Sequence, residues 1–147
     1  MKASQEFFQQ FMLLYRSFEH HLNDVLGNYG LYRAQWSILH YLANNGSATL
    51  VELAQYLRVE KPTITRTISR LENIGYLSHI PGKDRREKRI EMSETGYILY
   101  AEVRIAVDAL EEDILSGVSE AQQQQTTRIM KGIRHQLTSK EHTNEQK

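Results

Sequence analysis

The sequence VEKPTITRTISRLENIG, residues 59–75, has the pattern of a short amphipathic helix. Its aliphatic residues recur at intervals of four, three and three, which places them on one helical face that can be buried. They are Ile64, Ile68, Leu71 and Ile74. Pro62 suits the first helical turn, where its missing N–H costs nothing, and Gly75 suits the position just past the last turn. The pattern therefore predicts a helix bounded by Pro62 and Gly75.

The opposite face of this predicted helix carries side chains that can bind DNA. Arg66 and Arg70 can each donate two hydrogen bonds to the edge of a guanine. The side chains that can bind phosphate oxygens, or that lie on the same polar side, are Lys61, Thr63, Thr65 and Ser69. The alternative is an ordinary surface helix with a solvated polar face. The helix alone does not distinguish the two, so the flanking sequence decides.

Composition places the chain among ordinary globular proteins. It has 147 residues, 40% of them hydrophobic and 24% charged, so one domain with its own core is expected. No apolar run approaches the roughly 18 residues that span a bilayer, and the N-terminal sequence lacks the apolar segment of a signal peptide. We therefore expect a cytoplasmic protein. The absence of cysteine excludes disulfides, thiolate metal sites and a cysteine nucleophile.

Charge is balanced over the whole chain but not along it. The formal net charge is zero. Between Arg58 and Arg89, however, nine basic residues stand against four acidic ones, a net charge of +5, and the remainder carries −5. Attraction to DNA depends on the local field and not on the total charge. This central segment is therefore predicted to face phosphate groups.

Two helices are predicted between residues 34 and 57. The first of them spans Ala34–Ala43. Thr49 and Glu52 then form a capping box, in which each side chain satisfies a free backbone N–H, and this box opens a short helix that ends at Leu57. A turn at 58–61 leads into the helix described above. A short helix, a turn and a second helix in this order predict a helix-turn-helix.

A β-hairpin is predicted after Gly75. Residues 76–80 and 88–92 are strand-like, and residues 81–84 form a turn. The hairpin is basic near its tip, with Arg85, Arg86, Lys88 and Arg89. Such a ribbon could read the width of a minor groove through arginine. The alternative is a solvated charged loop, which the neighbouring helix-turn-helix disfavours.

Both ends of the chain are predicted to be amphipathic helices. One runs from an N-cap at Ser4 to about Gly27, and another begins at Ser93 with a coiled-coil-like seam. A stop at 116–118 and a capping box of Ser119 with Gln122 precede a final helix, and residues 141–147 are expected to fray. The first helix carries a wide apolar stripe: Phe7, Phe8, Phe11, Leu14, Tyr15, Phe18, Leu22, Val25 and Leu26. This stripe covers either the chain's own core or a second subunit.

From about Leu31 to Gly96 the chain resembles the MarR (multiple antibiotic resistance regulator) family of winged helix-turn-helix transcription factors. The matching pieces occur in order and at the family's spacing: Glu52-Leu53-Ala54, Pro62-Thr63-Ile64-Thr65-Arg66, Arg70-Leu71-Glu72, Gly75-Tyr76-Leu77, Asp84-Arg85-Arg86 and Met92-Ser93-Glu94-Thr95-Gly96. The flanking helices have the lengths that the family uses for dimerisation, so the resemblance extends over essentially the whole chain.

The resemblance implies roles for individual residues. Thr63, Thr65, Arg66 and Arg70 would face the major groove or its bordering phosphates. Arg86 would enter the minor groove, and Asp84 would orient an arginine through a bidentate pair. The chain departs from the family pattern at Glu60 and Tyr32, where a capping Ser or Thr is common, and at Ser78-His79, where arginines are common.

The expected fold is mainly α with a small β-hairpin wing. Residues 1–147 would form one MarR-like domain, with a helical dimerisation region at 1–30 and 98–140 and a winged helix-turn-helix at 31–97. A two-fold dimer would present two recognition helices about 34 Å apart, so the expected site on double-stranded DNA is a near-palindrome with half-sites about ten base pairs apart. The expected function is a homodimeric repressor that binds an operator and can be released by a small molecule.

Two alternatives remain open for the function. One is a ligand or metal sensor in which effector binding is the main role; the other is a constitutive DNA-binding activator or anti-silencer. The family holds ligands between the dimer helices and the winged module, and the residues that could approach that cleft are Tyr15, His21, Trp36, His40 and Arg104. For each of them ordinary packing is the competing explanation. With six histidines, no cysteine and no His-x-x-x-His pair, no metal site or cofactor is expected. No motif supports an enzyme.

Overall fold

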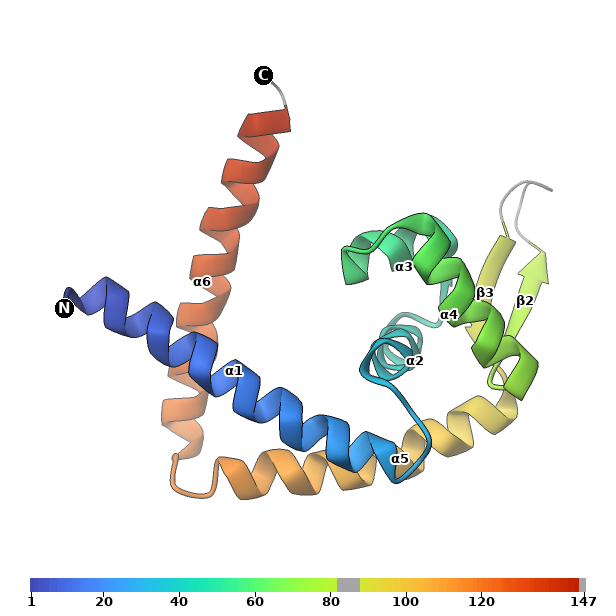
Figure 1. The fold of residues 1–147 in the computed structure, drawn as a ribbon, viewed down its shortest axis with the longest axis horizontal. Helices are drawn as coiled ribbons and strands as arrows, with labels where there is room; N and C mark the ends of the chain where they lie inside the picture. The colour runs from blue at the N-terminus through green and yellow to red at the C-terminus, as the bar shows by residue number, and fades with distance from the viewer. Residues whose placement is uncertain (82–87, 146–147) are drawn as a thin grey trace. The chain divides into compact units, whose positions relative to one another are not determined.

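The computed structural model describes residues 1–81 and 88–145, which form six helices and three strands (Figure 1). In chain order these are α1 (Ala3–Gly27), α2 (Arg33–Asn45), β1 (Ser47–Thr49), α3 (Leu50–Leu57), α4 (Lys61–Ile74), β2 (Leu77–Pro81), β3 (Lys88–Met92), α5 (Glu94–Ile114) and α6 (Glu120–Glu145). The chain divides into two compact units, Met1–Asp108 and Ala109–Lys147. No described helix is long and apolar enough to cross a membrane.

Helix α3 opens with the predicted capping box. The Glu52 backbone N–H donates to Thr49 Oγ1 at 3.2 Å, and the Thr49 N–H donates to a carboxylate oxygen of Glu52 at 3.4 Å. The helix ends at Arg58, whose φ of 54° lies in the left-handed region that side chains other than glycine seldom adopt. This reversal turns the chain into the next helix, so the predicted helix-turn-helix is confirmed.

Helix α4 has the predicted boundaries. Pro62 lies in its first turn, and Gly75 ends it with a φ of 99°. Ile64, Ile68 and Leu71 are buried as expected. The prediction for Ile74 was wrong, because the residue is 56% exposed. Ile74 is the last residue of α4, and the chain turns toward β2 at Gly75. No further turn of helix therefore covers the Ile74 side chain.

The wing is a three-stranded antiparallel sheet in the order β1-β3-β2. Strands β2 and β3 form the predicted hairpin, with His79 opposite Ile90, while β1 pairs Ala48 with the other side of Ile90. The sequence did not predict β1, whose three residues are too short to show a period. Strand β3 is therefore central, and Ile90 and Ala48 are almost completely buried.

The junction between the wing and α5 leaves no room for a side chain at Gly96. A Cβ atom there would lie 2.2 Å from the backbone oxygen of Tyr76. The Ser93 hydroxyl donates to the carbonyl of Gly75 and accepts from the Gly96 N–H at 3.1 Å. These contacts attach the start of α5 to the end of α4. Farther along α5, Val103 and Val107 join the core, whose fully buried members also include Leu26, Ile38, Leu39, Leu42, Leu53, Ile64, Leu71 and Ile90.

Helix α1 begins two residues earlier than predicted. Its N-cap is Lys2 and not Ser4, because the Gln5 side chain accepts the Lys2 backbone N–H at 2.8 Å. Only Leu22 and Leu26 of its apolar stripe are buried. Members of the stripe that remain exposed in the single chain are Phe7, Phe8, Phe11, Leu14 and Tyr15.

The unit Ala109–Lys147 contains the end of α5, a turn and α6. The predicted capping box is present at the start of α6, since Ser119 Oγ accepts from the Gln122 N–H at 3.2 Å and the Gln122 side chain accepts from the Ser119 N–H at 3.0 Å. The helix continues to Glu145 and so includes residues 141–145, where the sequence predicts fraying.

Candidate nucleic-acid interface

The exposed side of α4 carries the side chains that the sequence singles out for DNA. Those of Lys61, Thr63, Thr65, Arg66, Ser69 and Arg70 are exposed. The Thr65 hydroxyl donates to the carbonyl of Lys61 at 2.8 Å. Its proton is therefore already used within the helix, which leaves Thr65 a methyl group and an acceptor oxygen to offer to DNA.

A groove of about 610 Å³ separates α4 from the wing. Lys61, Thr65 and Ser69 line it from the helix, and Lys88 lines it from the start of β3. The structure thus brings together four predicted DNA-binding residues that come from two segments. A groove with cationic groups on both walls suits a strand of phosphates.

A second cleft, of about 230 Å³, lies on the other side of α4, against the start of α2. It is lined by Thr63, Arg66 and Arg70 together with Tyr32 and other residues. Tyr32 is 70% exposed and was not predicted as a site residue. The sequence shows it only as an N-cap without a capping side chain; its position beside the two arginines depends on how α2 packs on α4.

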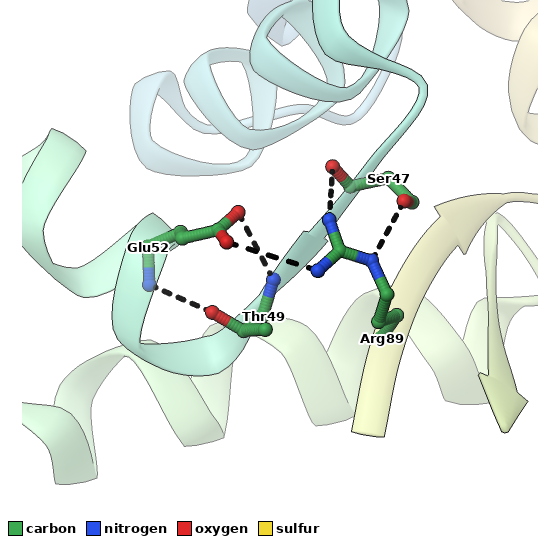
Figure 2. A network of polar contacts seen from close by, with 4 residues as sticks. All are labelled: Ser47, Thr49, Glu52 and Arg89. Carbon is green, nitrogen blue, oxygen red and sulfur yellow. Dashed lines mark hydrogen bonds and ion pairs between the residues drawn. The ribbon is translucent and has the colours of Figure 1, made fainter. Parts of the chain in front are cut away.

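Arg89 contributes to the basic segment of the sequence, but its guanidinium binds the protein (Figure 2). Its Nε donates to Ser47 Oγ at 3.0 Å and one terminal nitrogen donates to the Ser47 carbonyl at 3.3 Å. The other terminal nitrogen lies 3.8 Å from a carboxylate oxygen of Glu52. Arg89 therefore connects β3 to β1 and to the capping box of α3.

A second ion pair connects the wing to α4 itself. His79 Nε2 on β2 lies 2.7 Å from a carboxylate oxygen of Glu72. Both side chains line the groove that contains Lys61 and Lys88.

Three predicted wing residues, Asp84, Arg85 and Arg86, lie outside the described residues. Lys88 is the first residue of β3 and is exposed. The expected minor-groove contacts of the wing tip therefore rest on the sequence.

Three of the five predicted effector residues gather in one aromatic cluster. Trp36 stacks on Tyr100 with ring centroids 5.0 Å apart, and the guanidinium of Arg104 lies 5.7 Å from the Trp36 ring. His40 Nδ1 lies 3.0 Å from the Tyr100 hydroxyl, and His40 Nε2 lies 3.1 Å from the Asn44 amide nitrogen. An amide nitrogen can only donate, so this arrangement suits a neutral ring that accepts at Nε2 and donates from Nδ1. Tyr100 was not predicted as a site residue.

Tyr15 and His21 take part in different contacts. The Arg33 guanidinium lies 4.9 Å from the Tyr15 ring centroid and 2.6 Å from Glu19. Burial alone would lower the pKa of Arg33, but hydrogen bonds to Tyr15 and Glu19 outweigh it and raise the pKa. Arg33 therefore links α1 to the start of α2. The His21 side chain is exposed, with its ring 5.6 Å from that of His20. Among residues 1–81 and 88–145, no group of three His, Asp or Glu side chains could hold a metal ion.

Comparison with known proteins decides the family. The MarR family model matches residues 31–88. An uncharacterised HTH-type transcriptional regulator of Staphylococcus aureus is 31% identical over 145 residues, which cover 97% of this chain and 99% of the relative. The chain belongs to the MarR family. The HTH-type regulator YwoH of Bacillus subtilis is 39% identical over 94 residues, 64% of this chain and 69% of that protein.

Solved MarR structures have the same fold. Staphylococcus aureus MarR in complex with salicylate and kanamycin superposes with a TM-score of 0.84 at 29% identity, over 92% of this chain and 93% of that one. A mutant Escherichia coli MarR in complex with operator DNA gives a TM-score of 0.75 at 18% identity, over 90% and 99% of the two chains. This MarR-family protein is therefore a winged helix-turn-helix transcriptional regulator, and not an enzyme.

At the positions where this MarR-family protein departs from its family pattern, other groups serve in place of the usual ones. The Gln35 side chain accepts the Tyr32 backbone N–H at 2.9 Å, which caps α2 without a Ser or Thr. The Glu60 side chain makes no capping hydrogen bond with any described residue, and Pro62 lies in the first turn of α4. His79, where arginine is common, is paired with Glu72.

Proposed function

We propose that this MarR-family protein is a homodimeric repressor that reads a near-palindromic operator through α4. The observation that carries the proposal is the exposed polar face of α4, which has a cleft on each side. Arg66 and Arg70, in the cleft beside α2, would contact bases in the major groove. The residues that would bind or border the phosphates are Lys61, Thr63, Thr65, Ser69 and Lys88.

The wing would complete the interface. Arg85 and Arg86 supply the cationic groups at the hairpin tip, and the family resemblance assigns Arg86 to the minor groove and Asp84 to orienting an arginine. Two recognition helices reach successive major grooves when their spacing is about 34 Å. A dimer would supply that spacing.

The dimer is supported by apolar side chains that the single chain leaves exposed. Helix α1 exposes Phe7, Phe8 and Phe11 along one stripe, and α6 exposes Ile129 and Leu137. Large contiguous apolar surfaces on a single chain mark association sites. In this proposal residues 1–30 and 98–140 form the dimerisation region, and residues 31–97 bind DNA.

Selection of bound fragments from random duplex DNA tests the proposal directly. We expect an enriched near-palindrome with half-sites about ten base pairs apart, and a protein mass of two chains by light scattering. Placing the selected site across a promoter should lower reporter expression. A rise in expression would identify an activator, and the absence of any enriched sequence would contradict sequence-specific binding.

Release by an effector is a second proposal, supported by the cluster of Trp36, Tyr100 and Arg104. Stacked aromatic faces beside a guanidinium suit a small aromatic acid. The related Staphylococcus aureus structure contains salicylate. Salicylate titrated into a complex with the selected duplex should release the DNA. Retention of the DNA at saturating salicylate would argue against this class of effector and favour constitutive binding.

A further inference from the structure

The groove between α4 and the wing contains an acidic side chain whose charge a histidine can neutralise. Glu72 is the one carboxylate among the described residues that line this groove, where it faces the channel assigned above to phosphates. A carboxylate at such a place repels DNA. His79, on the opposite wall, lies 2.7 Å from it through Nε2.

The pair lies where solvent and DNA can both reach it. The side chain of His79 is 44% exposed and that of Glu72 is 26% exposed. A distance of 2.7 Å is the length of a charge-assisted N–H···O bond, which an imidazolium makes with a carboxylate. The neutral imidazole can also donate from Nε2, but it leaves the charge of Glu72 uncompensated.

Among the described residues, few charged groups line the groove beside His79. From α4 these are Lys61 and Glu72, and from β3 it is Lys88. Arg89 and Glu91 alternate with Lys88 and Ile90 along β3 and so project from the other face of the sheet. The described charges of the groove therefore sum to +1 when His79 is neutral and to +2 when it is protonated. Histidine is the side chain whose ordinary titration lies between pH 5 and 8.

We propose that the Glu72–His79 pair makes operator binding depend on protons, with His79 acting as a positioning residue. Protonation of His79 cancels the charge of Glu72 in the phosphate channel and tightens the connection between β2 and α4. DNA then binds more strongly at lower pH, because phosphates stabilise the protonated imidazole. This inference rests on the placement of DNA in the groove that is proposed above.

The test is the affinity for a duplex recovered from random DNA, measured at pH 6, 7 and 8 at one ionic strength. We expect the wild-type affinity to increase roughly threefold to tenfold from pH 8 to pH 6, the scale of one added charge near phosphate in a hydrated groove. His79→Gln should match the wild type at pH 8 and lose this increase. His79→Arg should bind at all three pH values as the wild type does at pH 6.

Two further variants separate this effect from folding and from other histidines. Glu72→Gln should bind more tightly than the wild type at pH 8, because the repelling charge is gone. His20 forms a comparable pair with Asp24, 3.7 Å apart and exposed on α1, so His20→Gln is the matched control and should keep the wild-type pH dependence. Circular dichroism at each pH would show that all variants are folded, and a purely structural role for His79 would not change the slope with pH.

The outcomes distinguish this inference from the placement on which it rests. A wild-type pH dependence in His79→Gln would overturn the role of His79. If in that case Lys88→Gln still weakens binding, the groove does hold DNA and only the proton-dependent role fails. If Lys88→Gln binds as the wild type does, the groove does not hold DNA and both fail.

Discussion

The guanidinium of Arg89 lies 3.8 Å from the carboxylate of Glu52 and thereby joins the central strand of the wing to the first helix of the helix-turn-helix (Figure 2). Glu52 also accepts the N–H of Thr49, and Arg89 also donates twice to Ser47. One ion pair thus connects the position of the wing to the capping box of α3. A basic residue that the sequence places in the DNA-binding segment has a structural role.

Replacing Arg89 tests this role. Arg89→Gln should lower the free energy of unfolding by about 1 kcal/mol, because the hydrogen bonds to Ser47 are lost while the partly exposed ion pair contributes little. Urea denaturation measures the change. Its neighbour Lys88 offers the matched comparison. Lys88→Gln should leave the free energy of unfolding within about 0.5 kcal/mol of the wild type. It should reduce the slope of log affinity against log salt concentration by about one. Equal stability of the two variants would contradict the assignment.

Arg70 should contribute to sequence recognition. Arg70→Ala is expected to weaken the binding free energy for the selected operator by roughly 1–3 kcal/mol. The difference in affinity between the operator and random DNA should therefore decrease. Competition binding with both duplexes measures this, with Arg128→Ala on α6 as a control that removes the same charge from outside the two clefts of α4. An equal loss on both duplexes would make Arg70 a phosphate contact.

Tyr32 should bind DNA without stabilising the fold. Because it is 70% exposed, Tyr32→Ala should change the free energy of unfolding by less than about 0.5 kcal/mol. Operator binding should weaken by about 1 kcal/mol if its hydroxyl bonds to DNA beside Arg66 and Arg70. Tyr32→Phe separates the hydroxyl from the ring, and full affinity in both variants would exclude Tyr32 from the interface.

Gly96 should tolerate no side chain. A Cβ atom would meet the Tyr76 backbone at 2.2 Å, so Gly96→Ala must displace either the start of α5 or the backbone at Tyr76, between α4 and β2. We expect a loss of more than about 2 kcal/mol in the free energy of unfolding. Gly117 has open space around its Cβ position, and Gly117→Ala is the control. Similar melting temperatures for the two variants would show that the junction can adjust.

The elements that follow from local chemistry are predictable from the chain. The capping box of Thr49 and Glu52, the proline in the first turn of α4 and the glycine after it act within a few residues, and the structure has all three. The hairpin of β2 and β3 follows in the same way, because alternation and a turn are local signals. These signals, together with the ordered MarR pieces, were sufficient to predict the family.

The structure also corrects details that local signals cannot settle. Ile74 keeps the helical spacing of a buried residue, but it is the last residue of α4 and is exposed. Ser4 is a good capping residue, but it lies inside α1, which already begins at Ala3. In both cases spacing or residue type was right, and the boundary of the element decided the outcome.

The sequence by itself thus determined the helix-turn-helix, the hairpin and the polar face of α4, because spacing, capping and turn chemistry act over a few residues. Only the tertiary structure decided which charged groups face DNA and which bind the protein. Arg89 reaches Ser47, 42 positions away along the chain, and His79 meets Glu72 across two elements. Strand β1 likewise exists only by pairing with β3. Such contacts depend on how elements pack, which no local pattern contains.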